Sequence, residues 1–212
     1  MMNKFIKAIC LSIVLSCAVF AQNDADDEYN KNEYYVGFSH QRVDDGGRRN
    51  LNGFEGSYTR NFNRWFGIRG TVSGAYEKTR LSGSVPNPTG GSFEFQQDYN
   101  RSVYNFLGGV QVKDNASKGR LKPFAFALGG VAVNRSQFKN LACTSGNCPP
   151  TIPFVGNATF TDTGIAGAFG GGLDIKINDK IDFRAIQVDY NPIYSNRRFD
   201  NNFRIGIGIV FK

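Results

Sequence analysis

The sequence is poor in the residues that supply most enzyme chemistry. Its 212 residues include one His, one Trp, two Met and four Cys. The single histidine, His40, follows Ser39, and neighbours on a strand point to opposite faces, so these two cannot form a nucleophile–base pair without distortion. We therefore expect no catalytic residue, no metal site and no cofactor, and we do not expect an enzyme.

A long apolar run is missing from the body of the chain, whose mean hydropathy is −0.34. The one apolar stretch, residues 8–16, lies near the N-terminus behind Lys4 and Lys7. It is too short for a stable membrane helix and is typical of a secretory signal peptide, so we assign residues 1–21 to a signal and expect export. Cys17 leaves lipid attachment as an alternative.

Clustered basic charge is also scarce. The formal net charge is +7, but Arg48-Arg49 and Arg197-Arg198 are the only adjacent basic pairs. Scattered basic residues are typical of solvated loops, so we predict no nucleic-acid partner. Residues 22–32 are acidic and without periodicity, and they predict a short flexible arm before the folded domain, residues 33–212.

What the chain has is alternation, most clearly in residues 203–212. Large apolar residues occupy every second position, and the positions between them are mostly small or charged. Because strand side chains alternate between faces, this predicts a strand with one greasy face. The segment also resembles the terminal strand of bacterial outer-membrane barrels, which assembly machinery reads. Its apolar face is Phe203, Ile205, Ile207, Ile209 and Phe211.

The same alternation recurs along residues 33–212 and predicts eight strands, with a bulge near Ala185 where the phase breaks. Short connections alternate with generally longer ones at residues 44–50, 80–92, 140–160 and 192–200. We predict an all-β, eight-stranded antiparallel up-and-down transmembrane β-barrel with short periplasmic turns and longer external loops.

Aromatic residues gather at the predicted strand ends, as in the belts where an apolar band meets the membrane interfaces. Because side chains alternate between the two faces of a strand, we place Phe124, Phe126 and Leu128 on the greasy face and Ala125 and Ala127 on the other. The predicted periplasmic girdle is Tyr34, Phe62, Trp65, Phe66, Phe124 and Phe183.

The polar faces predict a crowded interior of nearly balanced charge. An eight-stranded barrel is just wide enough for its own side chains, and buried charges cost several kcal/mol each unless they pair. We therefore predict an ion-pair network that would conduct poorly. Its members are Glu55, Arg69, Glu77, Asp174, Lys176, Asp182, Arg184, Asp189 and Arg204.

Two cysteines remain beyond the signal, Cys143 and Cys148, in the longest predicted loop. An even count at close spacing in an exported chain predicts a disulfide. Metal binding is disfavoured because no His or acidic residue lies near them.

The whole mature chain resembles small eight-stranded OmpA-like outer-membrane barrels, often labelled porin-family proteins. Lys212 is a departure, since many relatives end on the aromatic residue itself. The resemblance implies this fold and a Gram-negative outer-membrane location, but no catalytic residue and no agreed ligand. The stretches that carry it are NFNRWFGI (61–68), KPFAFALGGVA (122–132), AFGGGLDIKIN (168–178), IQVDY (186–190) and NNFRIGIGIVFK (201–212).

The leading functional hypothesis is a non-enzymatic outer-membrane barrel that anchors a platform of surface loops, for envelope integrity, adhesion or surface interaction. Its expected partners are outer-membrane lipid and lipopolysaccharide, the barrel-assembly machinery during biogenesis, and an unknown partner of the external loops. The alternatives are a narrow channel for small solutes, a soluble periplasmic lipid-binding barrel with its greasy face inward, and an outer-membrane lipid hydrolase.

Overall fold

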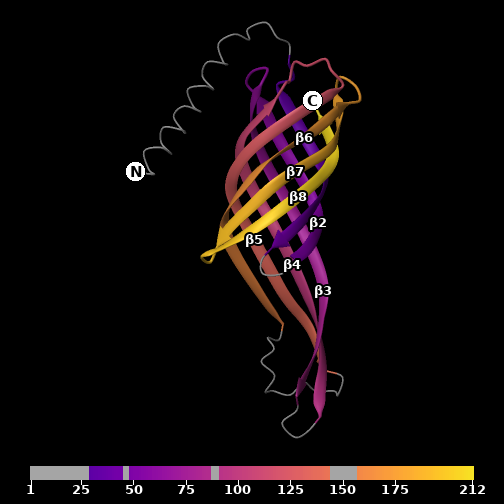
Figure 1. Ribbon diagram of the computed structural model, residues 1–212, viewed down its shortest axis with the longest axis vertical. Helices are drawn as coiled ribbons and strands as arrows, with labels where there is room; N and C mark the ends of the chain where they lie inside the picture. Colours follow the sequence, from indigo (N-terminus) through magenta and orange to yellow (C-terminus); the bar gives the residue numbers. More distant parts are fainter. Residues whose placement is uncertain (1–28, 45–47, 87–90, 144–156) are drawn as a thin grey trace, which may run out of the picture.

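Eight antiparallel strands pair in chain order and close into one barrel in the computed structural model, which describes residues 29–44, 48–86, 91–143 and 157–212 (Figure 1). The barrel closes where β8 pairs with β1, with Phe211 opposite Tyr34. The predicted all-β, eight-stranded fold is therefore confirmed. The strands are β1 (Asn32–Asp44), β2 (Arg48–Asn61), β3 (Phe66–Pro86), β4 (Ser92–Lys113), β5 (Leu121–Cys143), β6 (Ala158–Lys176), β7 (Ile181–Ser195) and β8 (Arg198–Phe211).

The predicted signal peptide, residues 1–21, and most of the predicted arm lie outside the described residues. From Tyr29 onward the chain is held to the barrel. The Tyr29 hydroxyl donates to the Phe62 carbonyl at 2.6 Å, and the Asn61 side chain donates to the Asn30 carbonyl at 2.7 Å. Within the described residues no helix is long and apolar enough to cross a membrane.

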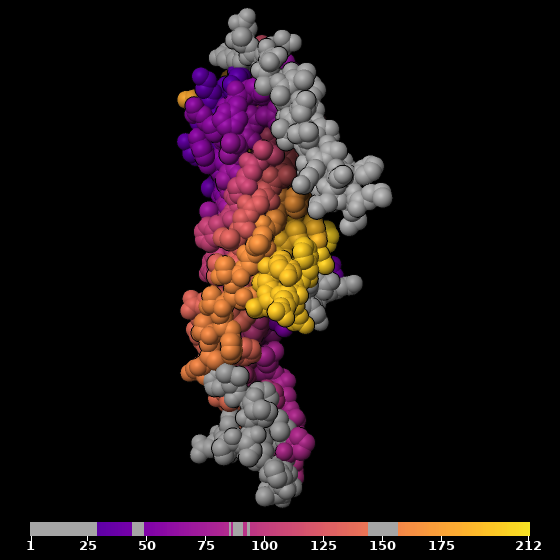
Figure 2. Space-filling view, turned by 90° about the vertical axis from the view of Figure 1, so that its left-hand side faces the viewer, coloured from indigo at the N-terminus to yellow at the C-terminus, as the bar shows by residue number. Residues whose placement is uncertain are grey.

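Alternation separates two chemically different faces on each strand. On β8 the outward side chains of Phe203 and Ile205 are 55% and 51% exposed, whereas Arg204 between them is 1% exposed. The strands wind steeply around the barrel, so their colours cross its surface as oblique bands (Figure 2). The large apolar side chains therefore cover the outside, and charged side chains lie within.

Four neighbouring strands are longer than the rest. β3 to β6 have 21, 22, 23 and 19 residues, whereas the other strands have 13 to 15. Their extra length projects past the barrel at the end opposite the C-terminus (Figure 1). We call this projection, formed by the distal parts of β3 to β6, the projecting sheet.

Two of the predicted long loops are mostly strand in the structure, so these two predictions are wrong. Residues 80–92 are mostly strand, because β3 continues to Pro86 and β4 begins at Ser92. Residues 192–200 also lie in strands, apart from a two-residue turn in which Asn196 and Arg197 have φ of 47° and 61°. Two left-handed residues suit a tight hairpin because their twist matches the strands. The proline and glycine content of residues 80–92 predicts a loop, yet the strand ladders continue through most of both segments.

The turns at the C-terminal end are short, as predicted, and asparagine side chains close two of them. Asn63 Oδ1 accepts hydrogen bonds from the backbone N–H groups of Trp65 and Phe66, at 2.8 and 2.7 Å. Asn178 Oδ1 accepts from the Lys180 N–H at 2.9 Å. A short side-chain acceptor two residues upstream replaces a backbone turn bond.

The predicted bulge near Ala185 is confirmed. The pairing of β7 shifts between Arg184 and Gln187 against β8, and between Leu173 and Asp174 on the β6 side. The extra residue reverses the phase of the rest of β7, so Ile186 and Val188 face outward while Gln187 and Asp189 are buried.

The predicted phase of β5 is wrong. Phe124, Phe126 and Leu128 are 5%, 6% and 3% exposed and point into the barrel, whereas Ala125 and Ala127 are exposed outside. Phe124 therefore does not belong to the outer girdle. The other five girdle residues do face outward at the C-terminal end, Tyr34, Phe62 and Trp65 exposed and Phe66 and Phe183 half-buried. The hydrophobic pattern predicts that the larger apolar residues of β5 face outward, but in the structure they face the interior.

Candidate functional site in the barrel interior

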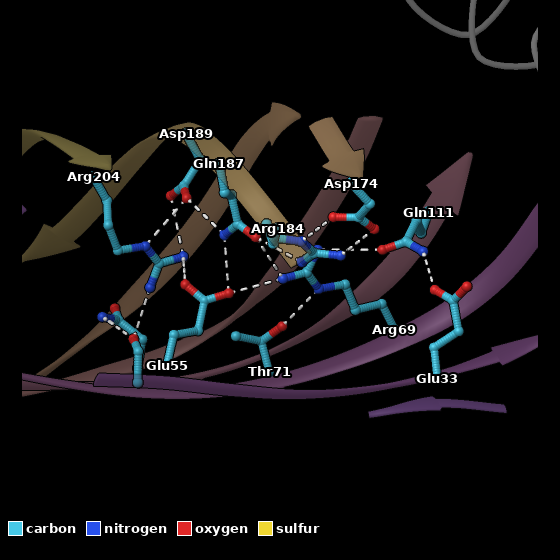
Figure 3. Close-up of polar contacts among 12 residues, drawn as sticks. Glu33, Glu55, Arg69, Thr71, Gln111, Asp174, Arg184, Gln187, Asp189 and Arg204 are labelled. Atoms are coloured by element: carbon cyan, nitrogen blue, oxygen red, sulfur yellow. Dashed lines mark hydrogen bonds and ion pairs between the residues drawn. The ribbon is translucent and has the colours of Figure 1, made fainter. Parts of the chain in front are cut away.

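The interior is filled by side chains from all eight strands, and its centre is a buried ionic cluster (Figure 3). Six of the nine predicted network residues meet in it. They belong to β2, β3, β6, β7 and β8, so the cluster forms only when the barrel is closed. The six are Glu55, Arg69, Asp174, Arg184, Asp189 and Arg204, each at most 2% exposed.

Glu55 lies between two arginines at the middle of the cluster. Arg69 donates to Glu55 Oε1 at 2.8 Å, and Arg204 lies 3.3 Å from Glu55 Oε2. Arg204 also pairs with Asp189 at 3.1 Å and donates to the Ser73 hydroxyl at 2.7 Å. A carboxylate shared by two guanidinium groups keeps its charge in the dry interior, so this group acts as a cross-strand brace.

A second group lies nearer the C-terminal end, around Asp174. Arg184 donates to both carboxylate oxygens of Asp174, at 2.8 and 3.1 Å, and the ammonium of Lys113 is 2.9 Å away. Lys113 also pairs with Glu33 at 2.9 Å. The two groups join through Gln187, which accepts from Arg184 at 2.9 Å and donates to Glu55 at 2.9 Å.

The inward rings of β5 cover two arginines of this network, Arg69 and Arg184. The Arg69 guanidinium lies 4.5 Å from the Phe126 ring centre, and that of Arg184 lies 4.0 Å from the Phe124 ring centre. The negative face of a ring attracts a cation, most strongly where water is excluded. Arg69 and Arg184 are therefore each held by a carboxylate on one side and by an aromatic face on the other.

Three predicted network residues lie at the margins. Glu77 is 3.9 Å from Arg49 at the far mouth, and Lys176 pairs with the exposed Asp179 at 2.6 Å. Asp182 is fully buried but pairs with Lys212 at 2.5 Å, apart from the central cluster. The structure brings these three to the two ends of the lumen rather than to its centre.

The predicted network leaves out several inward polar residues. Glu33, Gln111, Lys113 and Gln187 are buried and bonded into the network, and Lys212 is the partner of Asp182. Strand phase alone would have found Glu33 and Lys113, because each lies an even number of residues from a buried position on its strand. Both lie at strand ends, where charged side chains are ordinarily exposed.

The carboxylates and guanidinium groups of the cluster form ion pairs with one another, and among the described residues no group of three or more His, Cys, Asp or Glu could hold a metal ion. Ser39 is buried inside, whereas His40 bonds Asn52 Oδ1 on the outer side at 2.8 Å. The two side chains lie on opposite faces of β1, as strand geometry requires.

The remaining predicted sites lie at the two edges of the fold. Cys143 is buried at the end of β5, but Cys148 falls outside the described residues, so the disulfide stays a prediction. The predicted assembly strand is β8. Its five apolar residues are 40% to 55% exposed on the outside, and β8 pairs with both β1 and β7.

Comparison with known proteins gives structural relatives only. No family model and no curated protein matches the chain. Two crystal structures of Ail, the attachment invasion locus protein of Yersinia pestis, superimpose with a TM-score of 0.50. One, in complex with the heparin analogue sucrose octasulfate, is 15% identical and covers 85% of this chain and 97% of its own. The other is 13% identical and covers 87% and 100%.

Neisserial surface protein A is similar at a TM-score of 0.47, with 12% identity over 87% of this chain and 99% of its own. At these identities the Ail likeness establishes architecture, and it agrees with the closed barrel described above. The chain has the fold of the small eight-stranded outer-membrane barrels.

Proposed function

We propose that the protein is a non-enzymatic barrel of the Gram-negative outer membrane that anchors an external interaction surface. The observation that carries this proposal is the apolar exterior, which continues around the whole barrel. Each strand contributes at least one large apolar side chain that is 43% or more exposed. Examples in strand order are Val36, Phe54, Ile68, Phe106, Val131, Ile165, Val188 and Ile205.

Such an exterior is unfavourable in water, because soluble proteins rarely expose large continuous apolar patches. In a bilayer it is the surface that lipid solvates, while the closed ladder leaves no backbone group unpaired at an edge. A soluble lipid carrier needs the reverse arrangement, with an apolar cavity inside. Here the inside holds Arg69, Arg184 and Arg204, so the exterior is the lipid contact we propose.

The end that carries Lys212 is the one we assign to the periplasm, and the projecting sheet then extends outside the cell. Its outward side has a groove of about 460 Å³ lined by Lys78, Arg80, Asp98 and Lys139 among others. Hydrogen bonds from Asn140 and Arg80 hold the pKa of Asp98 below its ordinary value, so this carboxylate stays ionised. We propose adhesion or surface binding through this sheet.

Two further partners are proposed from this placement. Outer-membrane lipid and lipopolysaccharide would contact the apolar exterior and its aromatic girdle. The barrel-assembly machinery would engage β8, whose outward row is regular from Phe203 to Phe211.

The test is extraction and heat modifiability. We expect the native protein to stay with membranes through salt and alkaline washing, to be released by detergent, and to migrate faster in unheated than in heated gels. Full release into buffer without detergent would overturn the proposal.

A channel is the competing function, and the filled lumen opposes it. Arg69 alone bonds Glu55, Gln111 and Gln187, and so bridges three other strands across the bore. We expect no reproducible conductance step in planar bilayers. A stable step of constant size would favour the channel instead.

A further inference from the structure

A hollow of about 670 Å³ lies at the C-terminal end of the barrel, beside the turn between β4 and β5. Among the described residues that line it are four lysines and one acidic side chain, Asp179. The lysines are Lys118, Lys122, Lys176 and Lys212.

The positive charge of this hollow is only half matched. Lys176 pairs with Asp179 at 2.6 Å and Lys212 pairs with Asp182 at 2.5 Å. Lys122 is 4% exposed, and no carboxylate of the described residues lies within ion-pair distance of it. Its charged neighbours are Lys212, Lys113 and, farther than an ion pair, Asp182, which is already paired with Lys212. The exposed Lys118 likewise has no such partner in the described part of the chain.

A buried ammonium whose nearest carboxylate is paired with another lysine is costly, because its desolvation is not offset by an ion pair of its own. Here that ammonium faces an open hollow with a second unmatched ammonium at its rim. An anionic group, most simply a carboxylate, would complete such a site by accepting hydrogen bonds from the ammonium groups of Lys122 and Lys118.

We propose that the hollow is a carboxylate-binding site and that its occupant is the acidic stretch of the same chain that contains Asp24, Asp26, Asp27 and Glu28. The covalent path favours this occupant. Tyr29 and Asn30 themselves line the hollow and are tied to β2 and its turn, so Glu28 is attached at the rim. At about 3.3 Å per residue, the stretch can span the hollow. Tethering also gives its carboxylates a local concentration on the order of millimolar, which a free competitor must exceed.

This inference does not depend on the membrane placement, since it concerns one end of the closed barrel and the chain that leads into it. Binding of the stretch would cover the lysines and leave the opposite, projecting end free.

Amine labelling tests it on the detergent-solubilised full chain. The labelling rate of Lys118 is measured by mass spectrometry for the native protein, for a variant with Asp24→Asn, Asp26→Asn, Asp27→Asn and Glu28→Gln, and for Lys122→Gln. We expect neutralisation of the acidic stretch to raise the Lys118 rate about three- to ten-fold. High salt should do the same in the native protein only.

Lys122→Gln separates docking from a general field effect, because the two predict opposite signs. Removing a neighbouring positive charge would slow labelling of Lys118 by favouring its protonated form, whereas releasing a docked stretch would speed it. Lys180, exposed on the next turn and not part of the hollow, is the matched control and should change less than about two-fold.

Equal Lys118 rates in the native and neutralised proteins would overturn the proposal. Protection of Lys118 by added glutamate or inorganic phosphate, with no effect of the acidic stretch, would also overturn it by assigning the hollow to an external anion.

Discussion

β5 and β7 both run the length of the barrel, but their inward rows have opposite chemistry. β7 presents almost only polar groups to the lumen, and β5 presents almost only apolar ones. The β7 row is Asp182, Arg184, Gln187, Asp189, Asn191 and Ile193, and the β5 row above Lys122 is Phe124, Phe126, Leu128, Gly130 and Ala132.

The two rows meet through arginine. Arg184 is clamped by Asp174 and lies on the ring of Phe124, and Arg69 is bonded to Glu55 and lies on Phe126. A guanidinium group has polar edges and flat faces, so it can satisfy a carboxylate and an aromatic ring at once. The narrow lumen therefore packs a polar row of side chains against an apolar row, and the arginines contact both rows at once.

The largest expected effect comes from removing the carboxylate that pairs with Arg184. Asp174→Asn should destabilise the protein by about 3 to 5 kcal/mol, because Arg184 and Lys113 lose a shared counter-charge while remaining buried. The measurement is urea-induced unfolding in micelles, followed by the fluorescence of Trp65, the single tryptophan.

Asp179→Asn is the matched control. Its pair with Lys176 is at the surface and screened by water, so we expect a much smaller loss than for Asp174→Asn. Similar losses for both variants would mean that burial of the network contributes little to stability.

The same two strands show what could be predicted from sequence. On β7, charged residues alternate with Phe183, Val188 and Tyr190, so hydrophobicity fixes the phase, and the bulge at Ala185 is predicted by the phase break. On β5 both rows are apolar, one large and one small. Periodicity then predicts that the large residues face lipid. That prediction is wrong because the rings of Phe126 and Phe124 point inward and pack on Arg69 and Arg184.

For the interior, composition and phase predicted that charges fill the lumen, but not which charges meet. Glu55 and Arg204 are far apart in the chain and approach only because β8 closes on β1 and brings the walls together. The marginal positions of Glu77 and Lys176 depend on strand tilt, which no local pattern encodes. Chain ends such as Lys212 become lumen residues for the same reason.

Added volume sharpens the comparison on the apolar side. Ala168 pairs with Leu128 and is fully buried, so Ala168→Leu should cost up to about 3 kcal/mol through overpacking of the lumen. Ala127→Leu adds the same atoms on the outward face of β5 and should change stability by less than about 1 kcal/mol. If urea unfolding showed a larger loss for Ala127→Leu than for Ala168→Leu, Ala127 would face inward, as the periodicity of β5 predicts.

Adjacent glycines on β5 extend the test to the backbone. A Cβ at Gly130 would lie 2.1 Å from the Phe106 carbonyl oxygen, whereas a Cβ at Gly129 would meet nothing within 4 Å. Gly130→Ala should therefore destabilise by about 1 to 2 kcal/mol. Gly129→Ala should stabilise by about 0.5 to 1 kcal/mol, because it restricts the unfolded chain. Equal midpoints for the two variants would contradict the close approach of β4 and β5 on the inner side.

The smallest effect concerns the turn that leads into β5. Arg64 donates to both oxygens of Asp114 at 2.9 and 3.1 Å, and these bonds hold the pKa of Asp114 below its ordinary value. A depressed carboxyl pKa adds stability above the unfolded value of about 3.9, and that stability is lost as pH falls through the lower folded value. Asp114→Asn should therefore cost about 0.5 kcal/mol near neutral pH, and this cost should vanish at an acid pH low enough to protonate the carboxyl of folded Asp114. Unfolding of the two proteins at both pH values measures the difference, and a gap that persists in acid would assign the loss to turn geometry rather than to the ion pair.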